Sequence, residues 1–202
     1  MKKKILIVSS TNPFLSKFTG DRERIKSIIN YLSKKKYNVQ LVFSDKSADN
    51  LPKNLNYKFF KNNFFSKLLY TLISLIKLQP LQLGLFYSSN LNEYLKKNIN
   101  NFDIAIFHLI RTAQYLPNNY RGKKILEMTD LMSFNYFQTR SHLSYWNPLF
   151  YFFLIEEFLI NRYEQSIIKK FNKVILVNKN DIYNSKFKNN KVFKEIPLTI
   201  NN

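Results

Sequence analysis

The chain has 202 residues, a length that suits one domain with a sizeable hydrophobic core. Hydrophobic residues make up 45% of it and cysteine is absent, which excludes a disordered chain, a disulfide-bonded scaffold and a thiolate metal site. The formal net charge of +19 indicates a surface that attracts anions: phosphorylated substrates, anionic lipid or nucleic acid.

Nucleic acid is the least favoured of these partners, because no zinc finger, basic helix or RNA-binding strand pattern accompanies the charge. The two histidines, His108 and His142, lack metal-site spacing, so we expect no metal. The apolar runs at residues 68–76 and 149–155 are shorter than the roughly 20 residues that cross a bilayer. The run that follows three N-terminal lysines is too short for a signal peptide. We therefore expect a cytoplasmic protein.

The first elements are a strand, a loop and a helix. Residues 5–9 form an apolar run typical of a buried parallel strand. Ile25, Ile28, Ile29 and Leu32 then recur at helical spacing. We expect Gly20 to allow a tight turn before this helix, and Thr19 or Asp21 to cap it. With a second strand at 39–43 this is a βαβ unit, whose helix N-terminus can bind an anion.

The remaining elements continue the alternation of strands and helices. The pattern predicts strands at 102–108, 123–128, 173–177 and 191–197, with a short one at 57–60. It predicts helices at 66–78, 91–99 and 111–116, a long helix from Asn147-Pro148 to about Lys170, and a short one from Asn180. The expected class is therefore α/β: a Rossmann-like parallel sheet with helices on both faces.

Ligands of such sheets bind outside the carboxyl ends of the strands. The polar residues expected at that edge are Ser9, Ser10, Asn12, Gly20, His108, Arg111, Asp130 and Asn178. Their convergence from separate segments predicts a pocket.

The helix at 66–78 has two interpretations. Its apolar residues share one face, which suits packing on the sheet. Lysines flank that face, which suits a helix lying on an anionic membrane surface.

Four segments, in order, resemble a known family. They are Phe18-Thr19-Gly20-Asp21-Arg22-Glu23-Arg24-Ile25, residues 79–88, residues 125–136 with Glu-Met-Thr-Asp, and residues 161–164 before the strand at 174–177. Together they resemble the N-terminal half of family 4 glycosyltransferases, in the branch of bacterial sugar transferases for exopolysaccharide and cell-envelope synthesis.

The resemblance implies one half of a GT-B fold, spanning residues 1–202, with the C-terminal donor-binding domain absent. It implies a retaining, metal-independent transferase without a cofactor other than the nucleotide-sugar donor, inactive alone. The implied partners are a lipid-linked or polysaccharide acceptor, a donor-domain protein in trans and the inner face of the cell membrane.

The resemblance, for Gly20 and Asp130, and the position at the sheet edge, for His108 and Arg111, predict site residues, most of them with a plainer alternative. Asp130 is the expected catalytic residue, acting on the acceptor hydroxyl, or else it caps the following turn. Gly20, Asp21, His108 and Arg111 are the expected substrate-binding residues. Gly20 is otherwise a turn glycine, His108 a structural histidine and Arg111 a solvated charge.

Other charged residues are expected at the surface. Arg24 is expected to be solvated, and Glu157 and Glu164 to be solvated or paired with basic residues. Two rival functions stay open: a non-catalytic basic module that binds anionic membrane or a protein, and a nucleic-acid binder.

Overall fold

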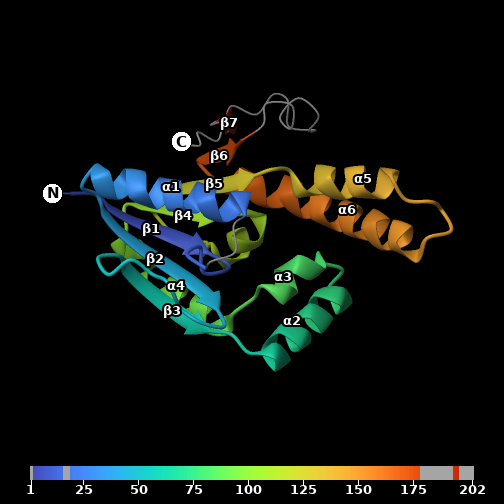
Figure 1. Ribbon diagram of the computed structural model, residues 1–202, viewed down its shortest axis with the longest axis horizontal. Helices are drawn as coiled ribbons and strands as arrows, with labels where there is room; N and C mark the ends of the chain where they lie inside the picture. Colours follow the sequence, from blue (N-terminus) through green and yellow to red (C-terminus); the bar gives the residue numbers. More distant parts are fainter. Residues whose placement is uncertain (1, 16–18, 178–192, 196–202) are drawn as a thin grey trace.

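A computed structural model describes residues 2–15, 19–177 and 193–195 of the chain. Seven parallel strands form one sheet in the order β3-β2-β1-β4-β5-β6-β7 (Figure 1). They are β1 (Lys4–Ser9), β2 (Asn38–Asp45), β3 (Asn56–Lys61), β4 (Ile104–His108), β5 (Lys123–Thr129), β6 (Lys173–Leu176) and β7 (Phe193–Glu195). The predicted α/β class and parallel sheet are confirmed. Several predictions concern residues outside the described ranges. They are the short helix that starts at Asn180, parts of the strand at 191–197, and the single residues Phe18 and Asn178.

Helices cover both faces of the sheet (Figure 1). One face packs against α1 (Gly20–Lys34), and the other against α4 (Ser89–Asn98) and the end of α6 (Pro148–Ile167). Alternate residues of β1 supply the two cores, as strand geometry requires. The α1 core contains Ile5, Ile7, Ile25, Ile29 and Leu41; the opposite core contains Leu6, Val8, Leu91, Leu95 and Ile160. Short 3-10 helices are η1 (Ile99–Asn101), η2 (Ile110–Tyr115) and η3 (Ile168–Lys170).

Two helical pairs extend beyond the carboxyl ends of the strands (Figure 1). One consists of α2 (Phe64–Ile76) and α3 (Leu81–Leu85); the other consists of α5 (Met132–Ser141) and the first part of α6. The pairs lie on opposite sides of the sheet edge that the sequence predicts to bind ligand.

The helix predicted at 66–78 exists as α2, but it does not bury its apolar residues on the sheet. Its main neighbour is α3, and Ser74 is its only buried residue. Leu68, Leu72 and Ile76 are 49%, 49% and 82% exposed. The interpretation as a sheet-packing helix is therefore wrong.

Two helices, α3 and α5, have no local capping signal. The residues before them, Pro80 and Leu131, make no side-chain cap. Both caps come from α6 instead: Glu156 accepts from the Leu81 N–H at 3.1 Å, and Glu164 accepts from the Met132 N–H at 3.0 Å. A carboxylate at a helix N-terminus also interacts favourably with the helix dipole.

Candidate active site

The candidate site lies where the strand order reverses. From β1 the chain runs outward through β2 and β3, then crosses back to β4 on the other side of β1. In open α/β sheets this switch point leaves a crevice at the carboxyl ends of the two strands. Ser9 ends β1 and His108 ends β4, so these two of the predicted polar residues lie at the ends of neighbouring strands.

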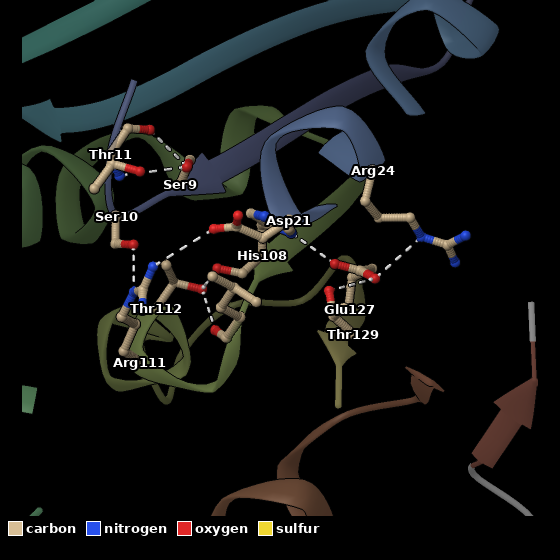
Figure 2. Close-up of polar contacts among 11 residues, drawn as sticks. Ser9, Ser10, Thr11, Asp21, Arg24, His108, Arg111, Thr112, Glu127 and Thr129 are labelled. Carbon is tan, nitrogen blue, oxygen red and sulfur yellow. Dashed lines mark hydrogen bonds and ion pairs between the residues drawn. The ribbon is translucent and has the colours of Figure 1, made fainter. Parts of the chain in front are cut away.

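Arg111 is held at the switch point by three kinds of contact. Its Nε donates to Ser10 Oγ at 2.6 Å (Figure 2). Its guanidinium carbon lies 4.1 Å from the centre of the Phe86 ring. One terminal nitrogen lies 4.0 Å from an Asp21 carboxylate oxygen. Burial lowers the pKa of Arg111 from its usual value, and the Asp21 charge opposes that shift. Arg111 is thus a fixed cation rather than a solvated surface charge.

Asp21 and Gly20 lie in the first turn of α1. Burial raises the pKa of Asp21, but the Thr19 hydroxyl, the His108 and Arg111 side chains and the Arg22 N–H together lower it below its usual value. Thr19 is the N-cap residue by position, although its side chain makes no cap hydrogen bond. Gly20 begins the helix without a positive φ, so the predicted tight turn does not require glycine there. A Cβ at Gly20 would meet no atom within 4 Å, which leaves open space beside this turn.

A buried chain of charged groups lies beneath the site. Glu127, fully buried on β5, accepts a hydrogen bond from Arg24 Nε at 3.2 Å, and its other oxygen lies 2.6 Å from His108 Nδ1 (Figure 2). Arg24 is 6% exposed, so the prediction of a solvated Arg24 is wrong. It fails because α1 turns this side chain toward β5, where a buried carboxylate needs a cation.

The backbone is strained where β4 and β5 end. Leu109 and Thr129 adopt φ values of 68° and 60°, in the region that side-chain-bearing residues avoid. The pairing of β5 with β6 shifts register between Glu127 and Thr129. Such conformations cost about 1–3 kcal/mol each and concentrate at functional sites. Here they lie directly after His108 and directly before Asp130.

Asp130 is exposed at the end of β5, and its carboxylate makes no hydrogen bond or ion pair within the described part of the chain. The alternative interpretation as a cap for the next turn is therefore wrong: Glu164 caps α5. Partial loss of solvent around the carboxylate, followed by the nearby Glu127 charge, raises the pKa of Asp130 above its usual value. These features suit a group that takes up a proton, as general base chemistry requires.

Three other predictions for charged and polar residues have mixed outcomes. Asn12 is a structural residue, because it is fully buried and its Nδ2 donates a hydrogen bond to the Asp49 carbonyl oxygen at 2.8 Å. Glu157 pairs with Arg140 at 2.9 Å, as expected. Glu164 is fully buried, so its predicted solvation or pairing with a basic residue is wrong.

Neither metal ligands nor a membrane span stand out in the described part of the chain. Residues 2–15, 19–177 and 193–195 contain no cluster of three His, Cys, Asp or Glu side chains that could hold a metal ion. None of the helices described combines the length and the apolarity that crossing a bilayer requires.

Comparisons with known proteins bear on the fold. No protein-family model and no curated protein matches the chain. Solved structures do match, among them sucrose-phosphate synthase from Thermosynechococcus elongatus and HepE from Anabaena, the latter in complex with UDP and glucose. The TM-scores are 0.61 and 0.56, at 10% and 11% sequence identity. The chain has a glycosyltransferase-like fold.

This glycosyltransferase-like fold corresponds to part of each matched enzyme. The alignments cover 99% and 96% of the chain, but only 49% and 44% of sucrose-phosphate synthase and HepE. The chain therefore spans about half the length of these GT-B glycosyltransferases.

Sequence reasoning missed Glu127, the residue with the most polar contacts in the site. A signal was available: Glu127 interrupts the apolar strand between Leu126 and Met128. An ionisable residue in a strand that is covered on both faces must find buried partners. Which partners it finds depends on strand order, which the sequence does not display.

Proposed function

We propose that the chain is the acceptor-binding half of a family 4-like glycosyltransferase. It would act with a donor-binding half, supplied in trans, to move a sugar from a nucleotide sugar to a lipid-linked or polysaccharide acceptor, with retention and without a metal. The observation that carries this proposal is the convergence of Asp21, His108 and Arg111 at the switch point of a glycosyltransferase-like fold. Asp130 is the proposed catalytic residue, because its carboxylate is exposed and unpaired after the end of β5, near Glu127.

Each group has a role that suits a glycosylated lipid diphosphate. Arg111 presents a fixed guanidinium, which binds phosphate oxygens through charge-assisted hydrogen bonds. Asp21 accepts hydrogen bonds from sugar hydroxyls, since its lowered pKa keeps it ionised. The open space at Gly20 lets a ligand approach the helix N-terminus, where free N–H groups favour anions. The UDP and glucose bound to HepE support nucleotide-sugar chemistry as the reaction class.

The test is binding of a farnesyl diphosphate-linked glucose to the chain, measured by titration calorimetry. Arg111→Gln should weaken binding at least about tenfold, because it removes a charge-assisted contact. Arg140→Gln is the matched control, since Arg140 also bonds a neighbour but lies on the α5–α6 pair. Absence of binding to the native chain, or equal losses in both variants, would reject this proposal.

A second proposed function, attachment to anionic membrane, is favoured by the exposed face of α2. Residues 50–92 contain five lysines and no acidic residue. Within this stretch α2 exposes Phe64, Phe65, Leu69 and Leu75 in addition to the three residues given above. An apolar face within a purely basic segment matches the chemistry of a helix lying in an anionic lipid surface. The proposed location is therefore the inner face of the cell membrane.

Sedimentation with phosphatidylglycerol vesicles tests this attachment. Leu68→Glu with Leu72→Glu should reduce binding more than tenfold, because two apolar side chains no longer enter the lipid. Tyr31→Glu with Tyr37→Glu changes the charge equally at exposed residues outside α2 and should have a much smaller effect. Equal loss in both double variants would mean that net charge, rather than α2, binds the vesicle.

A further inference from the structure

We infer that Glu127 is a positioning residue for His108: its carboxylate keeps the proton on Nδ1 and leaves Nε2 as the ring atom offered to a ligand. The effect of Glu127 on the His108 tautomer is a property of the ligand-free chain. Only its consequence for binding rests on the proposed function.

The geometry comes from strand pairing. His108 and Glu127 are register partners on the neighbouring parallel strands β4 and β5. The separation of 2.6 Å between Nδ1 and the Glu127 carboxylate is that of a strong hydrogen bond. An ionised carboxylate only accepts hydrogen bonds, so Nδ1 must carry the hydrogen. Free rotation cannot exchange the two ring nitrogens, because His108 is 2% exposed.

The second carboxylate oxygen also has partners. Arg24 Nε donates to it at 3.2 Å, and the Thr129 hydroxyl lies 3.4 Å away. Arginine remains charged in proteins, so a cation always faces this oxygen. In Figure 2 the Glu127 carboxylate bridges Arg24 and the His108 ring. The bridge joins α1, which carries Asp21, to β4, which ends at His108, and to β5, which ends one residue before Asp130.

The opposite ring nitrogen is left for a ligand. Nε2 has no hydrogen-bond partner among the residues that the structure describes. His108 ends β4 and Asp21 lies in the first turn of α1, at the same edge of the sheet. In the neutral ring Nε2 accepts a hydrogen bond, so it can receive one from a hydroxyl group of a sugar.

A purely structural role explains this arrangement poorly. Buried ion pairs are often no more stabilising than apolar side chains of the same volume, because both charges lose their hydration. Leucine or methionine at positions 24 and 127 would fill the same space beneath α1. The ionic chain gains something that apolar packing does not supply: a fixed tautomer and orientation of His108.

The first measurement is the nitrogen spectrum of the imidazole rings. The sequence has only two histidines, so His142→Gln leaves a single histidine signal, that of His108. At a pH where the ring is neutral, we expect the Nδ1–H tautomer in the native site, whereas free imidazole side chains prefer Nε2–H. An Nε2–H tautomer in the otherwise native chain would overturn the inference without any further variant.

The second measurement adds Glu127→Gln, which keeps the shape but supplies one oxygen and one NH2 group. Arg24 needs the oxygen, so the NH2 group should face Nδ1 and convert His108 to the Nε2–H tautomer. Glu157→Gln, in the ion pair on α6, is the control and should leave the tautomer unchanged. Retention of the Nδ1–H tautomer in Glu127→Gln would contradict the assigned role.

The consequence for ligands is tested with farnesyl diphosphate-linked glucose. We expect Glu127→Gln to weaken binding at least tenfold while the backbone spectrum stays native-like, because Nε2 then carries a hydrogen and no longer accepts one. A changed tautomer with unchanged affinity would refute positioning for this ligand. If the native chain does not bind the probe, the proposed function fails, but the tautomer measured without ligand still decides whether Glu127 sets the ring.

Discussion

Replacing Gly84 by alanine should destabilise the protein by about 3 kcal/mol. A Cβ at this position would clash with the Tyr70 carbonyl oxygen and would lie 2.6 Å from Ser74 Oγ, both on α2. The carbonyl belongs to a helical backbone, so rotation of a side chain cannot remove the clash. The two helices α2 and α3 must move apart, and the contact between the Tyr70 and Tyr87 rings, now 4.5 Å between centres, should be lost with them.

Gly20→Ala is the matched control for this prediction. A Cβ there meets no atom within 4 Å and the backbone has no positive φ, so alanine should be neutral or stabilise by up to about 1 kcal/mol. Urea unfolding followed by circular dichroism measures both variants. If Gly84→Ala unfolds at the native urea concentration, α2 and α3 do not pack as closely as the structure shows. Gly20→Ala also tests the proposed site. If it weakens binding of farnesyl diphosphate-linked glucose without lowering stability, the ligand approaches the chain at Gly20.

The free energy of unfolding should fall by about 3 kcal/mol between pH 4.5 and pH 7 because of Glu164 alone. Burial raises the pKa of Glu164 to about 7 from 4.5, although the Ser133 hydroxyl and the Ser133 and Met132 N–H groups lower it. Between these two pH values the folded chain holds a proton that the unfolded chain has released. Stability therefore decreases as pH rises through this range, and the loss is complete above pH 7.

Glu164→Gln isolates this contribution, because glutamine does not titrate and its oxygen can still accept from the α5 N-terminus. The difference in unfolding free energy between the variant and the native chain should grow by about 3 kcal/mol from pH 4.5 to pH 8. Ser133→Ala removes the hydroxyl that lies 2.5 Å from the carboxylate, so the decrease should move to higher pH. A difference that stays constant with pH would show that Glu164 remains ionised when folded.

The fold was predictable because its signals are local. Each buried strand is a short apolar run, and Asn147 with Pro148 marks the start of α6 at the predicted residue, with the Asn147 side chain accepting from the Leu149 N–H. By contrast, α3 and α5 were not predicted, because their N-termini are capped by Glu156 and Glu164 from a helix far along the chain. Local sequence cannot display a cap that tertiary packing supplies.

Several residues of the candidate site could be predicted from the sequence, but the contacts between them could not. His108 and Arg111 follow a buried strand, and Asp130 follows the next, so parallel pairing alone brings them to one edge. The buried position of Arg24 was not predictable, since a charged residue beside an apolar helical face is usually solvated. It is buried here because β5 lies within reach of α1 and carries Glu127 there.

The position of β1 inside the sheet, between β2 and β4, also sets the order in which the chain can fold. One edge of β1 pairs with β2 soon after synthesis, but its other edge waits for β4, whose pairing residues lie about one hundred positions later. At ordinary rates of translation that delay is about 5–20 s. During this time β1, an interior strand of the finished sheet, has an unpaired apolar edge in the nascent chain, available for aggregation or for a chaperone.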